Sequence, residues 1–464
     1  MIEPAKGIVL SGAQKKATAG AGADPVRAAA QRAVLAFSQN PCGADSLIDR
    51  FGSPDFGDRD RRFLRELIYG ALRWRNRLDA AYGRFLNEPE GRLAPPVREA
   101  LRLGAYQILF LDRVPDHGAV NTAVELAGGK KRRGARGLVN AVLRKVSQEP
   151  FHPPEGIEDR LTVWESHPRW LVRRWIARLG GKAARARCEA NNAEGPLVFR
   201  ANPLKGETAA LARALAAEGV PTEPGRYDPE CLWADTSGAS FTETASYTAG
   251  EFIVQDEASS LAARFAGVSP GQWALDVCAA PGGKTAVLAW MAGAEGKVIA
   301  ADRAPGRLGR LKNNCARIST PVGILAMDAG KLAFGPIFDH VLVDAPCSGL
   351  GVLRRHPDAR WRLRERDLER HRREQCALIA GAAGAVRPGG CLTYSVCTNE
   401  PEETDEVAGE VDRAGFLREP GSEFLPPGAR KFVDSGGALR ILPEAGNGLD
   451  GFFAVRWRRP IEAA

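Results

Sequence analysis

Two cysteines in the second half of the chain stand in short polar motifs. Cys347 lies in Asp-Ala-Pro-Cys-Ser-Gly, and Cys397 lies in Tyr-Ser-Val-Cys-Thr. Residues 275–285 have the sequence Leu-Asp-Val-Cys-Ala-Ala-Pro-Gly-Gly-Lys-Thr, the pattern of a strand that enters a glycine-rich turn and then a helix. Because a thiolate is a strong nucleophile, this arrangement predicts covalent catalysis beside a bound cofactor.

The surroundings of Cys347 and Cys397 differ from those expected for the other cysteines. Both follow predicted strands, where backbone N–H groups and helix N-termini lower a thiol pKa. A redox pair is the competing interpretation, but such a pair usually has Cys-x-x-Cys spacing, which the chain lacks. The scattered positions indicate neither disulfides nor a zinc site. We interpret six others as small apolar residues: Cys42, Cys188, Cys231, Cys315, Cys376 and Cys391.

The glycine-rich turn predicts a site for a nucleoside-type cofactor. Gly282 and Gly283 permit close backbone approach, and Asp302 ends the next predicted strand, where a carboxylate can accept two hydrogen bonds from a ribose. The turn has neither the Gly-x-Gly-x-x-Gly dinucleotide pattern nor P-loop spacing, although Lys284 and Thr285 follow it. S-adenosylmethionine, which has no phosphates, fits this pattern. A purely structural glycine turn is the alternative.

The periodicity of apolar residues changes along the chain and predicts three folded regions. The first has helical spacing throughout and is an all-α bundle. The second mixes helices, one of them expected over residues 164–179, with short strands in a small α/β subdomain. In the third, strands and helices alternate, which predicts a doubly wound, largely parallel, Rossmann-like sheet. The predicted divisions are a flexible tail 1–24, the bundle 25–147, a linker 148–163, the subdomain 164–257 and the sheet domain 258–464.

The charge of the chain favours a nucleic-acid partner. Its formal net charge is +8 and its pI is about 9.1. One basic run has no nearby acids. A second, arginine-rich segment has interleaved acids, so a solvated, ion-paired helix face is the alternative there. RNA contacts are predicted for Lys130, Lys131, Arg132, Arg133, Arg354, Arg355 and Arg360.

No apolar run is long enough to span a bilayer, and the N-terminus lacks the order of regions of a signal peptide. These features predict a cytoplasmic protein without a membrane partner. We also expect a monomer that binds no metal ion.

The motifs together resemble the Nol/Nop/Sun family of RNA 5-methylcytosine methyltransferases, and within it the bacterial RsmB/Fmu-type enzymes that act on 16S rRNA. The helical region is similar to NusB-type RNA-binding domains, with its clearest match over residues 58–74 and 117–143. The catalytic match covers residues 252–259, 275–285, 344–361, 394–403 and 450–453.

The resemblance implies roles for individual residues. It makes Cys397 the nucleophile and Cys347 the thiol that assists product release, with Asp344 and Lys284 in the catalytic group. The family usually has Thr before the nucleophile, where this chain has Val396. The implied S-adenosylmethionine site consists of Cys278, Ala279, Ala280, Pro281, Gly282, Gly283, Lys284, Asp302, Arg307, Asp328 and Asp344.

The chemistry implied by this resemblance explains the need for a thiol. C5 of cytosine is a poor nucleophile, and addition of a thiolate to C6 activates it. The base must first leave its stack. The implied function is methyl transfer from S-adenosylmethionine to C5 of a cytidine in 16S rRNA. The alternatives are the same chemistry on tRNA or 23S rRNA, a DNA cytosine methyltransferase, and a non-catalytic RNA-binding factor in ribosome assembly.

Overall fold

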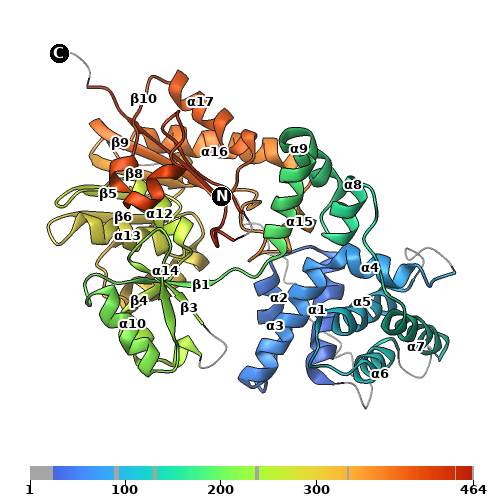
Figure 1. Cartoon of the computed structure of the whole chain (residues 1–464). Coiled ribbons are helices and arrows are strands. Elements are labelled where there is room, and N and C mark those ends of the chain that lie inside the picture. The colour runs from blue at the N-terminus through green and yellow to red at the C-terminus, as the bar shows by residue number, and fades with distance from the viewer. Residues whose placement is uncertain are drawn as a thin grey trace, which may run out of the picture. The chain divides into compact units, whose positions relative to one another are not determined.

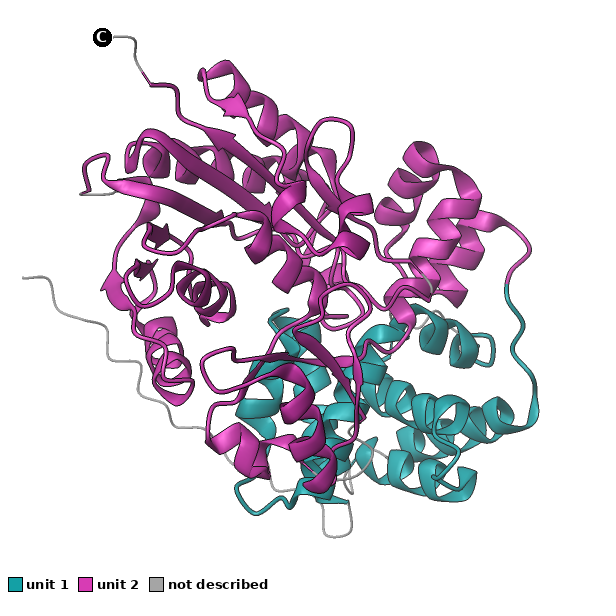
Figure 2. Cartoon of the chain, turned by 60° about the vertical axis from the view of Figure 1, so that its left-hand side comes forward, with its two compact units in different colours: residues 1–153 teal, residues 154–464 magenta. Residues whose placement is uncertain are grey.

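The computed structural model describes residues 24–87, 93–128, 133–235, 240–331, 334–444 and 446–461. The chain divides into two compact units, residues 1–153 (unit 1) and 154–464 (unit 2), which Figure 2 colours separately. In the described ranges, no helix has the length and apolar character needed to cross a membrane. The same ranges contain no group of three or more His, Cys, Asp or Glu side chains that could hold a metal ion.

The described part of unit 1 is helical, which confirms the predicted all-α bundle. Asp24 caps the first helix, because its Oδ1 accepts a hydrogen bond of 2.8 Å from the Arg27 N–H. Gly104 lets three helices pack closely, since a Cβ there would lie 2.4 Å from Leu143 Cδ1. The helices are α1 (Pro25–Gln39), α2 (Ala44–Phe51), α3 (Asp58–Arg73), α4 (Arg75–Gly83), α5 (Pro95–Phe110), α6 (Asp116–Leu126) and α7 (Arg133–Gln148).

Unit 2 begins with helical elements that the sequence located only in part. The short helix α8 (Ile157–Asp159) leads into the π-helix η2 (Arg160–Trp164), and α9 (Arg169–Asn192) follows. The predicted start of a helix at Trp164 is wrong, because Pro168 disfavours helical backbone in the residue before it. Within α9, Gly180 has φ 78° and ψ 160°, a conformation that only glycine adopts readily, and it bends the helix there.

A small antiparallel sheet forms the next part of unit 2, in the strand order β2-β3-β1-β4. Phe199 and Phe252 pack against each other across β1 and β4, with ring centres 4.3 Å apart, and Leu211 and Leu215 of α10 cover them. This arrangement agrees with the predicted mixture of helices and short strands. The elements are β1 (Leu197–Ala201), α10 (Thr208–Ala217), β2 (Thr222–Pro224), β3 (Cys231–Ala234), η3 (Phe241–Glu243), α11 (Ala245–Thr248) and β4 (Phe252–Val254).

The large sheet of unit 2 has a parallel centre and an antiparallel edge (Figure 1). Its main path is β10-β12-β9-β8-β5-β6-β7, and β11 pairs with β12. The pairs among β5 to β9 are parallel, whereas β12 runs antiparallel to β9, β10 and β11. The strands are β5 (Trp273–Asp276), β6 (Lys297–Asp302), β7 (Gly323–Ala326), β8 (Phe338–Asp344), β9 (Val386–Val396), β10 (Leu417–Arg418), β11 (Leu439–Ile441) and β12 (Phe452–Arg458).

Helices cover both faces of this sheet, which confirms the doubly wound, Rossmann-like prediction. Alternate residues of a strand point to opposite faces: Leu275 packs with α16 and α17, whereas the adjacent Ala274 packs with α13. The helical elements are α12 (Glu257–Phe265), α13 (Gly283–Ala292), α14 (Pro305–Arg317), η4 (Ala329–Lys331), α15 (Ala359–Arg362), α16 (Arg366–Ala383), η5 (Pro401–Glu403), α17 (Asp405–Arg413), η6 (Ser422–Phe424) and η7 (Pro427–Phe432).

Candidate functional site

The carboxyl ends of four parallel strands carry the predicted functional residues. β5 leads into the glycine-rich turn, β6 ends at Asp302, β8 ends at Asp344, and β9 ends one residue before Cys397. β8 and β9 are paired in register, with Asp344 opposite Ser395. In an open parallel sheet this edge is where ligands bind. The fold therefore gathers segments that are more than a hundred residues apart in sequence.

The glycine-rich turn is held in a conformation that requires glycine. Gly282 has φ 107°, and a Cβ there would lie 2.7 Å from Leu311 Cδ1. Thr285, in the first turn of α13, donates a hydrogen bond of 2.8 Å to Asp276 Oδ2. Burial raises the pKa of Asp276 to about 7, although the bond from Thr285 lowers it. Asp276 was not among the predicted functional residues, although its position directly before the glycine-rich turn could have indicated it.

The pocket at this edge of the sheet has a volume of about 530 Å³, within the range of about 300–1,000 Å³ that is usual for small-molecule and cofactor sites. Four residues of the predicted cofactor site line it: Cys278, Asp302, Arg307 and Asp328. The predicted residues that do not line it are Ala279, Ala280, Pro281, Gly282, Gly283, Lys284 and Asp344. The sequence analysis missed the wall that α16 supplies, because nothing in the sequence of that helix shows which strand end it covers.

Asp302 is fixed at the base of this pocket. Its Oδ1 accepts the Ala304 N–H at 3.0 Å, and its Oδ2 accepts the Ala280 N–H at 3.2 Å. The Arg307 guanidinium lies 3.3 Å from Oδ2 and also donates to the Ala280 carbonyl. A carboxylate oriented in this way can still accept hydrogen bonds from a ribose diol. Apolar side chains of the pocket, such as Val277 and Leu378, offer a surface for an adenine ring. The residues present therefore fit S-adenosylmethionine.

The two predicted catalytic thiols are neighbours. Cys347 Sγ and Cys397 Sγ lie 3.2 Å apart, and both side chains are half-buried. The hydrogen bond to Cys397, followed by burial, raises the pKa of Cys347 well above its ordinary value. The raised pKa favours the protonated form of Cys347, and the short distance places the two thiols in direct contact.

An ion pair lies beside the thiols. Lys284 Nζ donates to Asp344 Oδ2 at 2.8 Å, and Ser395 Oγ donates to Asp344 Oδ1 at 2.7 Å. Burial alone would lower the pKa of Lys284, but the Asp344 carboxylate outweighs burial and raises it, and Cys397 contributes in the same direction. Lys284 is therefore a cation that is held by the Asp344 carboxylate and lies close to Cys397.

Hydrogen bonds tie together the loops that carry the two thiols. The Gly351 N–H donates to the Cys397 carbonyl at 3.0 Å, and Ser348 Oγ donates to Thr398 Oγ1 at 3.2 Å. Val396, in the position where the resembling family usually has Thr, is fully buried in the apolar core of the sheet. The hydroxyl groups near Cys397 are instead those of Ser395 and Thr398, on either side of it.

The predicted RNA-binding residues have different environments. Lys130, Lys131 and Arg132 lie outside the described residues, and so does the side chain of Arg133. The prediction of a surface role for two of the others is wrong: Arg354 is 7% exposed and Arg360 is fully buried. Arg354 pairs with Asp450, and Arg360 donates to the Ser166 carbonyl and to Asn192.

Arg355 is more exposed than Arg354 and Arg360. Its side chain is 26% exposed, and it binds Asp256 and Asp450. The partners of all three arginines lie between about 90 and 200 residues away in sequence, so the local charge pattern could not reveal them.

Family models match three parts of the chain. The model described as "16S rRNA methyltransferase RsmB/F" matches residues 266–458, the model of the NusB family matches residues 26–148, and the model of a ferredoxin-like domain of RsmF/B-like methyltransferases matches residues 167–238. The ferredoxin-like match includes α9 and three strands of the small sheet, β1, β2 and β3.

Similar proteins match almost the whole chain. "Probable ribosomal RNA small subunit methyltransferase B" of Bacillus subtilis is 34% identical over 448 residues, covering 94% of this chain and 98% of that protein. "Ribosomal RNA small subunit methyltransferase B" of Pseudomonas putida is 31% identical and covers 93% and 97%. The crystal structure of PH0851 has a TM-score of 0.75 at 24% identity, covers 94% of this chain and 98% of that one, and supports the fold. The chain therefore belongs to the RsmB/F family of 16S rRNA methyltransferases.

Proposed function

We propose that this protein methylates C5 of a specific cytidine in 16S rRNA through a covalent bond between Cys397 Sγ and C6 of the base. The observation that carries the proposal is the thiol pair, 3.2 Å apart at neighbouring strand ends. S-adenosylmethionine, when bound, supplies an electrophilic methyl group. The names of the relatives support a small-subunit rRNA substrate.

The thiols act in sequence in this mechanism. Cys397 loses its proton and forms the S–C6 bond, and the electrons of the C5–C6 double bond then make C5 nucleophilic. Lys284 stabilises the thiolate. The negative charge that develops at N3 of the ring is neutralised by a proton shared between N3 and Asp344, whose side chain is 30% exposed. After C5 is methylated, its proton leaves to a base, the C5–C6 double bond re-forms and the S–C6 bond breaks. Cys347 assists this last step.

The remaining chain organises the substrate. We propose that the NusB-like bundle, residues 25–147, docks RNA, that residues 164–257 and 258–464 form the small α/β and catalytic domains, and that residues 148–163 link them. We expect the enzyme to act in the cytoplasm as a monomer.

Serine variants of the two thiols test the mechanism. With 16S rRNA that contains 5-fluorocytidine, the unchanged enzyme should form an adduct that survives denaturing electrophoresis. Cys397→Ser should form neither adduct nor product, because a hydroxyl ionises far less than a thiol. With ordinary RNA, Cys347→Ser should accumulate the adduct because release stalls.

A trapped adduct with Cys397→Ser and none with Cys347→Ser would reverse the assignment of the two thiols. Bisulfite sequencing of rRNA from cells with and without the protein would locate the target. A lost signal in tRNA or 23S rRNA, with 16S rRNA unchanged, would contradict the proposed substrate.

A further inference from the structure

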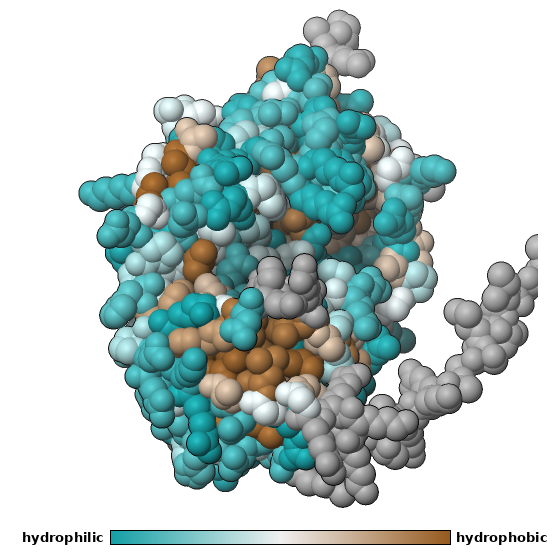
Figure 3. Space-filling model, turned by 90° about the vertical axis from the view of Figure 1, so that its right-hand side faces the viewer, coloured by the Kyte–Doolittle hydropathy of each residue, from teal (hydrophilic) through white to brown (hydrophobic). Residues whose placement is uncertain are grey.

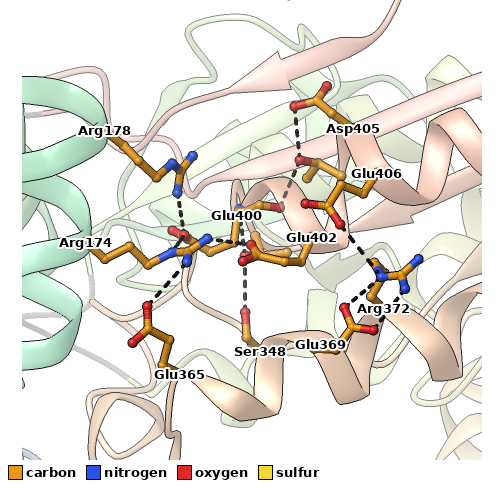
Figure 4. Close-up of polar contacts among 12 residues, drawn as sticks. Arg174, Arg178, Ser348, Glu365, Glu369, Arg372, Glu400, Glu402, Asp405 and Glu406 are labelled. Carbon is orange, nitrogen blue, oxygen red and sulfur yellow. Dashed lines mark hydrogen bonds and ion pairs between the residues drawn. The ribbon is translucent and has the colours of Figure 1, made fainter.

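A buried carboxylate three residues after the nucleophile is surrounded by basic side chains (Figure 4). Glu400 is fully buried. Its Oε2 accepts from Arg174 Nε at 2.7 Å and from Arg178, and its Oε1 accepts from Trp175 Nε1 at 2.9 Å and lies 3.4 Å from Arg187 Nη2. All four partners belong to α9, more than 200 residues earlier in the chain. They form an α9 clamp on Glu400.

The bend in α9 lets both of its halves reach the same carboxylate. Arg174 and Arg178 are one helical turn apart on the first half and point together towards Glu400. Arg187 comes from the second half, beyond Gly180, and its guanidinium lies 4.5 Å from the centre of the Trp175 ring. A straight helix would carry Arg187 about 20 Å away from Arg174 along its axis.

The carboxylate is charged in this environment. Burial alone would raise the pKa of Glu400, but the arginines outweigh burial and hold the pKa below its ordinary value. A buried ion pair with this many charged hydrogen bonds fixes the geometry of its members. Glu400 therefore anchors its stretch of backbone in one place.

The anchored backbone is the loop that carries the nucleophile. The Glu400 N–H donates to Thr398 Oγ1 at 3.3 Å, and Thr404 Oγ1 donates to the Glu400 carbonyl at 2.9 Å. Thr398 directly follows Cys397 and also accepts the bond from Ser348. The loop that carries Cys397 is thus held at two points: α9 binds it through Glu400, and the loop that carries Cys347 binds it through Thr398.

The same helix contacts the loop of the second thiol through apolar side chains. Leu350 and Leu353, which follow Cys347, share a fully buried cluster with Leu171 and Trp175 of α9. α9 therefore lies against both thiol loops, one through charge and the other through apolar packing. None of these contacts touches the cofactor pocket.

We infer that Arg174, Arg178 and Arg187 are positioning residues, which act through Glu400 to set the place of Cys397 relative to the target base; this rests on the proposed covalent mechanism. Reacting atoms must meet within a few tenths of an ångström, and a misplacement of about 1 Å slows a reaction about 100-fold. The clamp extends the machinery for the reaction to α9, a helix inside the part of the chain that matches the ferredoxin-like domain model.

Two variants test this role: one removes the charge of Glu400, and the other removes one of the guanidinium groups that bind it. Glu400→Gln keeps the shape and removes the charge. Arg178→Gln is milder, because this side chain is 29% exposed and the other three partners of Glu400 remain. The matched control is Arg169→Gln on the same helix, whose guanidinium binds only Glu158 and Asp159 at the surface.

The rate of adduct formation with 5-fluorocytidine RNA should fall about 100-fold for Glu400→Gln and about 10-fold for Arg178→Gln. Affinities for S-adenosylmethionine by calorimetry, and for RNA by filter binding, should stay within twofold. If the clamp had only a structural role, the variants would have a lower melting temperature, but they would not combine a slower rate of adduct formation with unchanged affinities. Arg178→Lys should recover part of the rate.

Two outcomes overturn different claims. If folded Arg178→Gln forms the adduct as fast as Arg169→Gln, the clamp does not position the nucleophile. If the unchanged enzyme forms no adduct at all, the covalent mechanism fails first, and the positioning role fails with it.

Discussion

Asp276 gives the catalytic unit a stability that depends on pH. It is buried, and burial raises its pKa to about 7, above the value of about 3.9 in an unfolded chain. The folded state therefore holds a proton that the unfolded state releases. This contribution to stability is complete below about pH 4 and is lost as the pH rises through about 7.

Asp276→Asn should remove this dependence, because an amide carries no charge and can still accept the hydrogen bond from Thr285. Between pH 5 and pH 8 the unfolding free energy of the unchanged protein should fall relative to the variant by up to a few kcal/mol. Calorimetric melting at several pH values measures this, with the exposed Asp45→Asn as control. A difference in melting temperature that stays constant with pH would contradict the assignment.

At the residue scale, the sequence predicted the positions of the thiols and of the cofactor-site carboxylate better than it predicted the surroundings of the arginines. Cys347, Cys397 and Asp302 follow strands whose type and order local patterns predict, so their meeting at one edge was predictable. Arg360 was not, because a local pattern shows a charge but not the distant carbonyl groups that bury it. The clamp on Glu400 escaped prediction for the same reason.

At the scale of elements, the turn between β5 and α13 depends on its glycine. Gly282→Ala should be strained, because φ 107° is unfavourable for a residue with a Cβ and Leu311 occupies the space. We expect S-adenosylmethionine affinity, measured by calorimetry, to fall about tenfold, equivalent to about 1.4 kcal/mol. Gly306→Ala in α14 is the matched control, since nothing lies within 4 Å of its Cβ position. Equal affinities of the two variants would show that the turn tolerates a side chain.

Helix boundaries show what local patterns miss. The sequence predicted a helix that ends at Leu179, next to the bend of α9 at Gly180, but placed the start of that helix at Trp164. The chain instead forms a π-helix up to Trp164 and restarts after Pro168. The core residue Leu161 and the packing of His167 against Trp175 fix that choice, and both contacts are tertiary.

At the scale of the whole molecule, the prediction concerns the charge that engages RNA. Figure 3 shows one face on which hydrophilic side chains predominate, with an apolar area over unit 1. We predict that the run of basic residues 130–133 contributes electrostatic contacts to RNA. Replacing all four with glutamine should weaken binding and reduce the log–log salt slope by up to about four.

The matched control is Arg59→Gln with Arg62→Gln on the exposed side of α3, which should leave the slope unchanged. Filter binding between 50 and 200 mM salt, a range over which such contacts are lost, gives both slopes. If the four-residue variant keeps the slope of the unchanged protein, the run is only a solvated surface.

The strand that covers the outer edge of β9 is β12, which is synthesised after β9. β9 carries Cys397 at its end, and its outer edge is paired only by β12, with Val396 opposite Phe453. The ribosome therefore makes Lys284, Asp344, Cys347 and Cys397 before it makes the strand that covers β9. Until β12 docks, the nascent chain exposes unpaired backbone groups along β9, an edge that can pair with other chains. A chain that ended just before β12 would contain the two thiols, Lys284 and Asp344, but the uncovered edge of β9 would make it prone to aggregate.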